Sequence, residues 1–480
     1  MGTVKRIYWN TVYLGTAEIV SRILQFVVML YAARLLSKEH FGKFSFALSL
    51  SLIAIVLADL GINTLLIREI SRNKKLAGKY FVNAFFTKAV LSFITYFIIM
   101  TVLNLLNYPQ DTRQIVYIIW LFTILSTFTE LFYSIFRAFE MMQYDAFLKI
   151  LRMALLTIAS LYVLFRGYGV VAFAYTFVFV EIIVVLAALV IALSKFIKIK
   201  PLFDFQFSKS LLSNALPFGL AIVFGSIYFF IGSVMLSRIR GDAEVAVYSV
   251  AYNLALAILF IPTVYTNAIY PVLSRYYEES REKLRILYEK SFKYLYIIGL
   301  PISVGSYLLA ERMIFFFYGK TYAASIPALQ IISWYMFIKF LNFLLGTMLS
   351  SIDRQDKRML GQGATAGFNV LLNLLLIPKT GYIGAAWATF ATEIFLFILY
   401  YLYVSKNFYV YNFSKVLLKP LIAVAVMFFV IKFANIGLVL TVFFSALAYF
   451  AALFVLKAFD KGDYTIIKAI FQNENIRQNR

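Results

Sequence analysis

The chain has 480 residues, of which 62% are hydrophobic and 14% charged, and its mean hydropathy is +0.83. A soluble domain carries about 25% charged residues, so its core could not bury this much apolar surface and a lipid bilayer must solvate the excess. Cysteine is absent and His40 is the single histidine, which excludes disulfides and multi-histidine metal sites, so no metal is expected. The net charge of +22 could suggest a nucleic-acid partner. We expect none, because the basic residues lie in short gaps between apolar stretches, as membrane topology explains.

A helix that crosses the bilayer needs about 20 apolar residues. Fourteen segments reach or approach that length, in chain order 10–33, 43–67, 80–106, 114–136, 148–166, 169–194, 211–237, 245–273, 292–317, 325–350, 360–377, 382–404, 415–434 and 436–456. The first is not predicted to be a cleaved signal peptide, because it contains Glu18 and Arg22 and has no small-residue cleavage motif. We therefore expect an all-α membrane protein with about fourteen transmembrane helices.

Lysine and arginine are much more frequent in the gaps on the side of the N-terminus than in those on the opposite side. By the positive-inside rule this predicts a protein of the cytoplasmic membrane with both termini in the cytoplasm. The longest gap, residues 274–291, is charged and is expected to form a short interfacial helix. No gap could hold a soluble catalytic domain, which argues against an enzyme such as a sugar polymerase.

The two halves of the chain resemble each other. A shift of 204 residues places Asn10 on Asn214 and Asn63 on Asn267, and a shift of 214 places Gly167 on Gly381. Each copy would hold six helices, so the copies would have the same orientation in the membrane. We expect a first lobe (1–200), a second lobe (201–410) and a C-terminal helix pair with a cytoplasmic tail (411–480). Two such lobes are typical of alternating-access transporters, with the site between the lobes.

Several short motifs share an order and spacing with one family of transporters. They are Ser21-Arg22-Ile23-Leu24, Ala33-Arg34-Leu35-Leu36, Phe41-Gly42-Lys43-Phe44-Ser45, Asp59-Leu60-Gly61, Arg68-Glu69-Ile70, Phe136-Arg137-Ala138, Asn373, Ile377-Pro378 and Gly381-Tyr382-Ile383-Gly384-Ala385-Ala386-Trp387-Ala388-Thr389. Over residues 10–405 the chain resembles the polysaccharide transporter family, which contains the Wzx-type O-antigen flippases of the multidrug, oligosaccharidyl-lipid and polysaccharide exporter superfamily. The resemblance implies two six-helix lobes, a cationic cavity, and flipping of polyprenyl-diphosphate-linked oligosaccharides.

Ionisable side chains inside the predicted helices are the candidate site residues. We single out eight of them: Glu18, Arg22, Asp59, Lys88, Glu130, Glu181, Lys339 and Glu393. Each would cost about 2.5–3.5 kcal/mol at the bilayer centre if it faced lipid, so most are expected to face the protein interior or a wet cavity. Glu130 lies near the predicted cytoplasmic end of its helix and is expected to pair with Arg137 or with solvent.

The basic members of this set are the candidate ligands for the substrate diphosphate. Glu18 and Arg22 are one turn apart and can pair, either as a closed structural pair or with Arg22 directed at phosphate, where its planar fork can donate twice. Lys339 is too deep in its helix to reach the interface and is expected to face Arg22 from the other lobe. Lys88 is shallower, so snorkelling explains it nearly as well as substrate binding.

The acidic members are candidates for coupling or orienting groups. Glu181 and Glu393 lie on corresponding helices of the two copies, where a carboxylate that exchanges H⁺ or Na⁺ could couple transport to an ion gradient. The alternative is a carboxylate that only accepts hydrogen bonds across helices. Asp59 has the same two interpretations, and the nearby Gly61 and Asn63 favour a local helix break.

The sequence therefore predicts a flippase for a lipid-linked sugar, with membrane lipid as its surroundings and no cofactor apart from a coupling ion. The chain is expected to act as a monomer. A multidrug or organic-cation antiporter of the same superfamily is the alternative. It would need unpaired carboxylates, not cations, in the central cavity.

Overall fold

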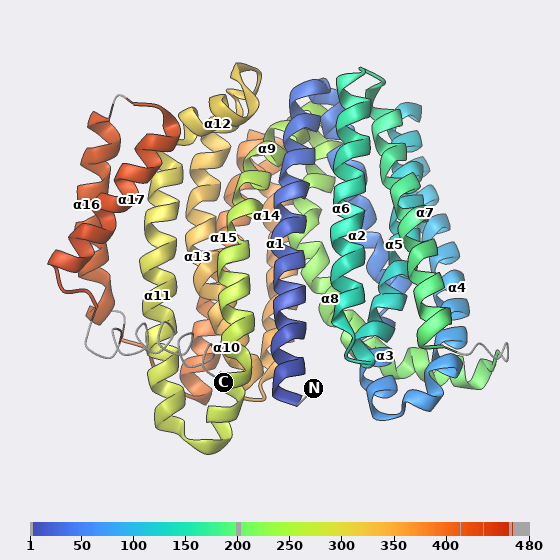
Figure 1. Ribbon diagram of the computed structural model, residues 1–480. Coiled ribbons are helices and arrows are strands. Elements are labelled where there is room, and N and C mark those ends of the chain that lie inside the picture. The colour runs from blue at the N-terminus through green and yellow to red at the C-terminus, as the bar shows by residue number, and fades with distance from the viewer. Residues whose placement is uncertain (1–2, 198–202, 413, 435, 460–462, 464–480) are drawn as a thin grey trace.

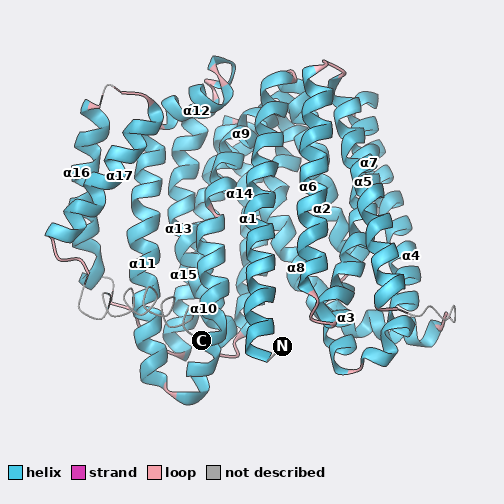
Figure 2. Ribbon diagram, in the orientation of Figure 1, coloured by secondary structure: helices cyan, strands magenta, loops and turns pink. Residues whose placement is uncertain are grey.

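The computed structural model describes residues 3–197, 203–412, 414–434, 436–459 and 463, and this part of the chain is helical without strands (Figure 2). The first half contains α1 (Thr3–Leu35), α2 (Lys38–Asp59), α3 (Ile62–Arg72), η1 (Lys74–Leu76), α4 (Ala77–Leu105), α5 (Gln110–Ala138), α6 (Met142–Phe165) and α7 (Gly169–Lys195). The second half contains α8 (Phe205–Arg240), α9 (Asp242–Ile258), α10 (Phe260–Glu279), α11 (Arg281–Leu308), α12 (Ala310–Tyr318), η2 (Lys320–Tyr322), α13 (Ser325–Ser351), α14 (Gln355–Thr380) and α15 (Tyr382–Asn407). Two more helices follow, α16 (Ser414–Phe433) and α17 (Leu438–Val455).

Three of the predicted segments are broken, and one of them, 245–273, is interrupted only at Leu259 between α9 and α10. The segment 43–67 is interrupted where Leu60 and Gly61 adopt positive φ angles of 43° and 82°, which confirms the expected helix break next to Asp59. The segment 292–317 is bent by 75° between α11 and α12. The expected interfacial helix over 274–291 is wrong, because those residues continue α10 and α11. Only Ser280 separates the two helices, and its side chain accepts a hydrogen bond from the backbone N–H of Lys283.

The all-α membrane class is confirmed, but the count of about fourteen spans is not. Within the described residues, twelve helices are long and apolar enough to cross a bilayer, or thirteen if the bent pair α11–α12 forms one span. The boundary predicted near residue 200 and the predicted cytoplasmic tail fall largely outside the described residues.

The helices pack in two groups, for which we keep the names first lobe (α1–α7) and second lobe (α8–α15). In the first lobe α1 packs on α6, and α5 on α2 and α7. In the second lobe α13 packs on α11 and α15, and α14 on α8 and α15. The C-terminal pair, α16 and α17, stands at one edge against α11 (Figure 1).

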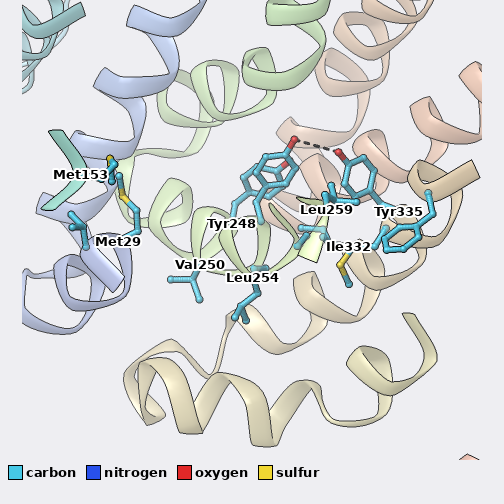
Figure 3. Packing of buried hydrophobic residues seen from close by; sticks show 14 of the residues in the cluster. Met29, Met153, Tyr248, Val250, Leu254, Leu259, Ile332 and Tyr335 are labelled. Carbon is cyan, nitrogen blue, oxygen red and sulfur yellow. Dashed lines mark hydrogen bonds between the residues drawn. The ribbon is translucent and has the colours of Figure 1, made fainter. Parts of the chain in front are cut away.

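The core is continuous through both lobes. Figure 3 shows Met29 and Met153 together in the first lobe, and Tyr248 and Tyr335 within the second. The hydroxyl of Tyr248 is satisfied inside this core, since it shares a hydrogen bond of 2.9 Å with Thr389.

We name the side on which α1 begins the terminus side, at the bottom of Figure 1, and the opposite one the far side. The lobes are in contact at the far side, where α2 packs on α9, and also along α8, which packs on α2, α3 and α4. Thr112 of the first lobe donates a hydrogen bond of 3.4 Å to Asp242 of α9, and Arg34 donates one of 2.5 Å to the carbonyl of Phe316. These contacts close the far side between the lobes.

Gly42 permits this closure, because a Cβ at that position would lie 1.7 Å from the backbone oxygen of Asp242. We expect Gly42→Ala to force α2 away from α9 and shift the population toward states open at the far side. Since the chain has no cysteine, a single Ser49→Cys reporter, buried two turns further along α2, can measure this. Its labelling by a membrane-impermeant maleimide from the far side should increase several-fold.

Gly225→Ala is the matched control for this substitution. A Cβ on Gly225 would meet no atom within 4 Å, so the added methyl group should not alter labelling of the reporter. Equal labelling of the Gly42→Ala protein and its parent would contradict a closure that depends on this close approach.

Candidate substrate-binding cavities

The first lobe encloses a cavity of about 320 Å³ near the middle of its helices. Its polar lining comes from α1, α5, α6 and α7 and consists of Glu18, Ser21, Arg22, Gln25, Thr123, Ser126, Lys149, Arg152 and Glu181. Apolar residues of the same helices and of α2 complete the wall. Three cations and two carboxylates thus surround this space, so the lining side chains carry a net positive charge.

Arg22 and Glu18 form the expected pair on α1. Arg22 Nε donates to Glu18 Oε1 over 2.9 Å, and both side chains remain partly exposed, at 43% and 41%. The pair is therefore not closed off in the core. Arg22 lines the cavity with its charge already oriented by Glu18, so an anion in the cavity could bind the guanidinium from its open side.

Glu181 of α7 is fully buried and is held from two helices. Thr129 Oγ1 of α5 donates to its Oε1 over 2.6 Å, and the guanidinium of Arg152 of α6 lies 3.7 Å from its Oε2. Burying a carboxylate requires such partners, because an unpaired charge in a low-dielectric interior is very costly. Arg152 remains 25% exposed and also lines the cavity, so it can contact a ligand while it balances Glu181.

The second lobe has its own cavity, of about 440 Å³. Its polar lining consists of Thr263, Thr266, Asn267, Tyr270, Lys339, Asn342, Thr347, Ser350, Gln355, Arg358, Gln362 and Tyr400. Arg358 is in the first turns of α14 and Ser350 is in the last turn of α13, so the cavity extends from mid-helix toward the terminus side. Both charged lining residues, Lys339 and Arg358, are cations.

Lys339 is paired with Glu393 behind the wall of this cavity. Its Nζ lies 3.3 Å from Glu393 Oε2 and 4.7 Å from the ring centres of both Tyr228 and Phe229. Glu393 is fully buried and accepts two hydrogen bonds from Asn342, at 2.7 Å to Oε1 and 2.9 Å to its backbone oxygen, and a further one from the Tyr228 hydroxyl. The aromatic rings and the carboxylate together stabilise an ammonium group deep in the helix bundle.

The two buried carboxylates occupy matching places. Glu181 is on the last helix of the first lobe and Glu393 on the last helix of the second, and each accepts a hydrogen bond from the helix two before it, α5 or α13. In each lobe a cation next to the carboxylate lines the cavity. Arg22 and Lys339, however, line separate cavities, one per lobe, and not a single chamber.

Lys88 and Asp59 are placed elsewhere. Lys88 is fully buried, so the snorkelling interpretation is wrong. Its Nζ lies 2.8 Å from Asp59 Oδ1 and donates hydrogen bonds of 2.9 Å to Asn63 Oδ1 and the Thr127 carbonyl. In the described part of the chain neither Lys88 nor Asp59 lines either cavity. Substrate binding by Lys88 stays a prediction, but the ammonium group would first have to leave these three partners.

We expect Asp59→Ala to destabilise the protein by about 3–5 kcal/mol, because it leaves the buried Lys88 ammonium without a counter-charge. The double variant Asp59→Ala/Lys88→Met should recover much of that loss. Thermal unfolding of the purified protein in detergent, arranged as a double-mutant cycle, measures the coupling. Additive losses from the two single substitutions would contradict a buried pair, and transport by the double variant would exclude Lys88 as a substrate ligand.

Sequence reasoning missed Arg152 and Arg358. Arg152 lies ten residues inside α6, but the predicted helix started at 148 and left it near a loop. Arg358 was assigned to a loop because the predicted helix started at 360, whereas α14 starts at Gln355. Both helices start with polar residues, so the predicted helices began too late and these two cations were not recognised as part of the membrane-embedded region. The predicted pair of Glu130 and Arg137 is confirmed at 3.4 Å.

Two helical lobes with a polar cavity in each define a membrane transporter of the two-lobed class. The chain belongs to the polysaccharide biosynthesis protein family, whose pattern matches residues 7–277, and a MatE pattern matches residues 217–375. The resemblance found in the sequence motifs is therefore confirmed.

Curated relatives cover most of the chain. The chain is 23% identical over 83% of its length to the capsular polysaccharide biosynthesis protein CapF of Staphylococcus aureus, covering 99% of that protein. It is 27% identical over 83% of its length to a putative O-antigen transporter of Escherichia coli K12, covering 96% of that protein. These relatives are named for polysaccharide biosynthesis and transport.

Solved structures share the fold. The lipid II flippase MurJ in an inward closed conformation superposes with a TM-score of 0.76 at 16% identity, covering 92% of this chain and 98% of the MurJ chain. An inward-facing multidrug transporter of the MATE family superposes with a TM-score of 0.65 at 17% identity, covering 81% and 95%. The chain thus has the fold that these flippases and multidrug transporters share.

Proposed function

We propose that this protein is a flippase that moves a polyprenyl-diphosphate-linked oligosaccharide across the cytoplasmic membrane by alternating access. The observation that carries the proposal is the cation next to a buried carboxylate at the wall of a cavity in each lobe, Arg152 with Glu181 and Lys339 with Glu393. The names of the curated relatives support a lipid-linked sugar as the substrate.

In the proposed cycle the diphosphate competes with the carboxylates for their cations. Arg22 and Arg152 offer planar donor groups suited to two adjacent phosphate oxygens. Lys339 offers a point charge in the other lobe, so a doubly charged head group that contacts both cavities would draw the lobes together. The lipid tail stays in the bilayer while the far-side contacts of α2 with α9 open and release the head group.

A carboxylate whose cation has been taken by substrate becomes free to bind H⁺ or Na⁺. We propose Glu393 as the coupling carboxylate, because it is fully buried and has only Lys339 as a charged partner in the described contacts. An ion gradient would then reset the empty transporter. The orientation with cytoplasmic termini and action as a monomer belong to the same proposal.

Export of organic cations on the same fold is the second candidate, and the MatE match over 217–375 supports it. Such a substrate needs carboxylates that are not already balanced. Both Glu181 and Glu393 are paired with cations, and the two charged residues of the second cavity are basic. The charge of the cavities therefore favours an anionic head group.

The test uses purified protein in liposomes that contain a fluorescent polyprenyl-diphosphate oligosaccharide. We expect dithionite to quench both leaflets in liposomes with protein, and the outer leaflet alone in empty liposomes. The same sugar on a polyprenol without diphosphate is the control and should not cross. Crossing of both lipids, or export of ethidium without movement of the diphosphate lipid, would overturn the proposal.

A further inference from the structure

The cavity of the second lobe is lined mainly by uncharged polar side chains, which the proposed function leaves without a role. Of its twelve polar lining residues, ten carry no charge and two, Lys339 and Arg358, are basic. The cavity of the first lobe differs, because five of its nine polar lining residues are charged. The two lobes therefore offer a ligand different chemistry, mainly ionic in the first and mainly hydrogen-bonding in the second.

The polar groups of the second cavity form stripes on its helices. On α14, Gln355, Arg358 and Gln362 follow one another at intervals of three and four residues, so they share one face of the helix. On α10, Asn267 and Tyr270 are three residues apart, and both α10 and α14 pack on α13. Polar side chains directed at lipid would be costly, because the hydrocarbon offers them no hydrogen-bond partner. These stripes face a shared polar space instead.

The amide groups of this wall are free to bind a ligand. In the part of the chain that the structure describes, the side chains of Asn267, Gln355 and Gln362 make no hydrogen bond with another residue. A primary amide carries two N–H donors and an acceptor oxygen in one plane. A sugar hydroxyl both donates and accepts, so one amide can bind two neighbouring hydroxyls of a sugar ring.

The hydroxyl groups of the wall add acceptors. Thr263, Thr347 and Ser350 each donate to the backbone oxygen four residues earlier, over 2.9, 2.8 and 3.1 Å. Since the hydrogen of each hydroxyl is used inside its own helix, the oxygen keeps acceptor capacity. Ser350 uses this capacity to accept a hydrogen bond of 2.8 Å from Arg358 Nη1, which orients the guanidinium in the wall. Donors and acceptors thus alternate around the cavity.

The size and the apolar part of the cavity also suit a saccharide. Tyr270, which is 43% exposed, and Phe343 contribute aromatic surface to the lining. Such rings can pack on the apolar C–H face of a sugar while polar groups bind its edge. The volume of about 440 Å³ falls within the range of about 300–1,000 Å³ that is usual for cavities binding small molecules.

We propose that the cavity of the second lobe is the saccharide subsite of the transporter, in which Gln355 and Gln362 of α14 and Asn267 of α10 bind sugar hydroxyl groups. This assignment rests on the proposed function, because it takes a lipid-linked oligosaccharide as the substrate. Lys339 lies at the mid-helix end of the cavity and can still contact the diphosphate there. The polar faces of α10 and α14 would then determine which saccharides bind, while the cations recognise the diphosphate.

The test measures binding to the purified full-length protein in detergent by native mass spectrometry with two probes. One is a polyprenyl diphosphate that carries a neutral trisaccharide of hexose and N-acetylhexosamine, and the other is a polyprenyl diphosphate with a methyl group in place of the sugar. Q355L/Q362L removes two amides at nearly constant volume. It should weaken binding of the sugar-bearing lipid on the order of 10-fold, since a neutral hydrogen bond contributes about 3- to 10-fold. Binding of the methyl-capped lipid should not change, because its diphosphate has the same charge and meets the same cations.

Q143L is the matched control, because it removes an exposed glutamine in the first turn of α6 that is not among the lining residues of either substrate cavity. It should bind both lipids as the wild-type protein does. If Q355L/Q362L weakens both lipids equally, the two glutamines serve the diphosphate or the fold, and the saccharide subsite is refuted. Unchanged affinity of Q355L/Q362L for the sugar-bearing lipid refutes it as well.

The two probes also keep this proposal apart from the flippase proposal. If the wild-type protein binds both lipids and the glutamine substitutions do not matter, the saccharide subsite alone is wrong. If the wild-type protein binds neither lipid, the substrate assignment fails together with the subsite. Neither result requires a transport measurement.

Discussion

Replacing Arg152 by alanine is expected to reduce flipping of the diphosphate lipid by on the order of 10- to 100-fold, the loss of one or two hydrogen bonds to a charged group. Arg152 combines a cavity-lining position with 25% exposure, so its guanidinium can reach substrate. The initial rate at which labelled lipid of the inner leaflet becomes accessible to dithionite in the liposome assay measures this loss. Arg166→Ala, an exposed arginine at the other end of the same helix, is the matched control.

The alternative is that Arg152 only balances Glu181. Arg152→Ala leaves Glu181 fully buried without its cation, which destabilises the fold by itself. The double variant Arg152→Ala/Glu181→Gln removes both charges and should unfold close to the wild-type temperature. If substrate contacts Arg152, the double variant still fails to flip lipid, whereas recovered flipping would assign the arginine a structural role alone.

Glu393→Gln is expected to abolish accumulation driven by an ion gradient while lipid still equilibrates between leaflets. Glutamine keeps one acceptor oxygen, which can face Asn342, and its NH₂ group can donate to the Tyr228 hydroxyl, but it cannot gain or lose a proton and binds Na⁺ poorly. The measurement imposes a proton or a sodium gradient across liposomes and follows the asymmetry of the labelled lipid at steady state. Accumulation by the Glu393→Gln protein would contradict a coupling role for this carboxylate.

Two further variants distinguish coupling from binding at the same pair. Lys339→Met, which also loses the ammonium next to the Tyr228 and Phe229 rings, should raise the substrate concentration needed for half-maximal flipping. Glu311→Gln, an exposed carboxylate at the start of α12, should change neither property. If Lys339→Met changes gradient dependence alone, the lysine serves coupling and not substrate.

Much of the architecture could be predicted from the sequence, because transmembrane helices are specified locally. A run of about 20 apolar residues has no other stable state in a bilayer than a helix, so each predicted segment coincides with a helix or a broken pair. The ion pair of Glu18 and Arg22 could also be predicted from the sequence, since residues four apart on a helix are neighbours whatever the rest of the fold is. Gly61 next to Asp59 marked the helix break.

The partners of the deep charges could not be predicted in this way. Lys88 pairs with Asp59 across two helices, and Lys339 pairs with Glu393 from the helix two further along, so both pairs exist only after packing. Arg152 was overlooked because helix starts are the least precise part of a sequence prediction. The division of cationic groups between two cavities also depends on how the lobes enclose space.

The sequence by itself determined the membrane class, the family and the presence of costly charges among apolar helices, because these depend on composition and on spacing along one helix. The tertiary structure decided which charges neutralise one another and which line a cavity. Whether Lys88 or Arg152 can reach a ligand depends on side chains contributed by helices far away in the chain. No local sequence pattern encodes which of those helices pack around a given residue.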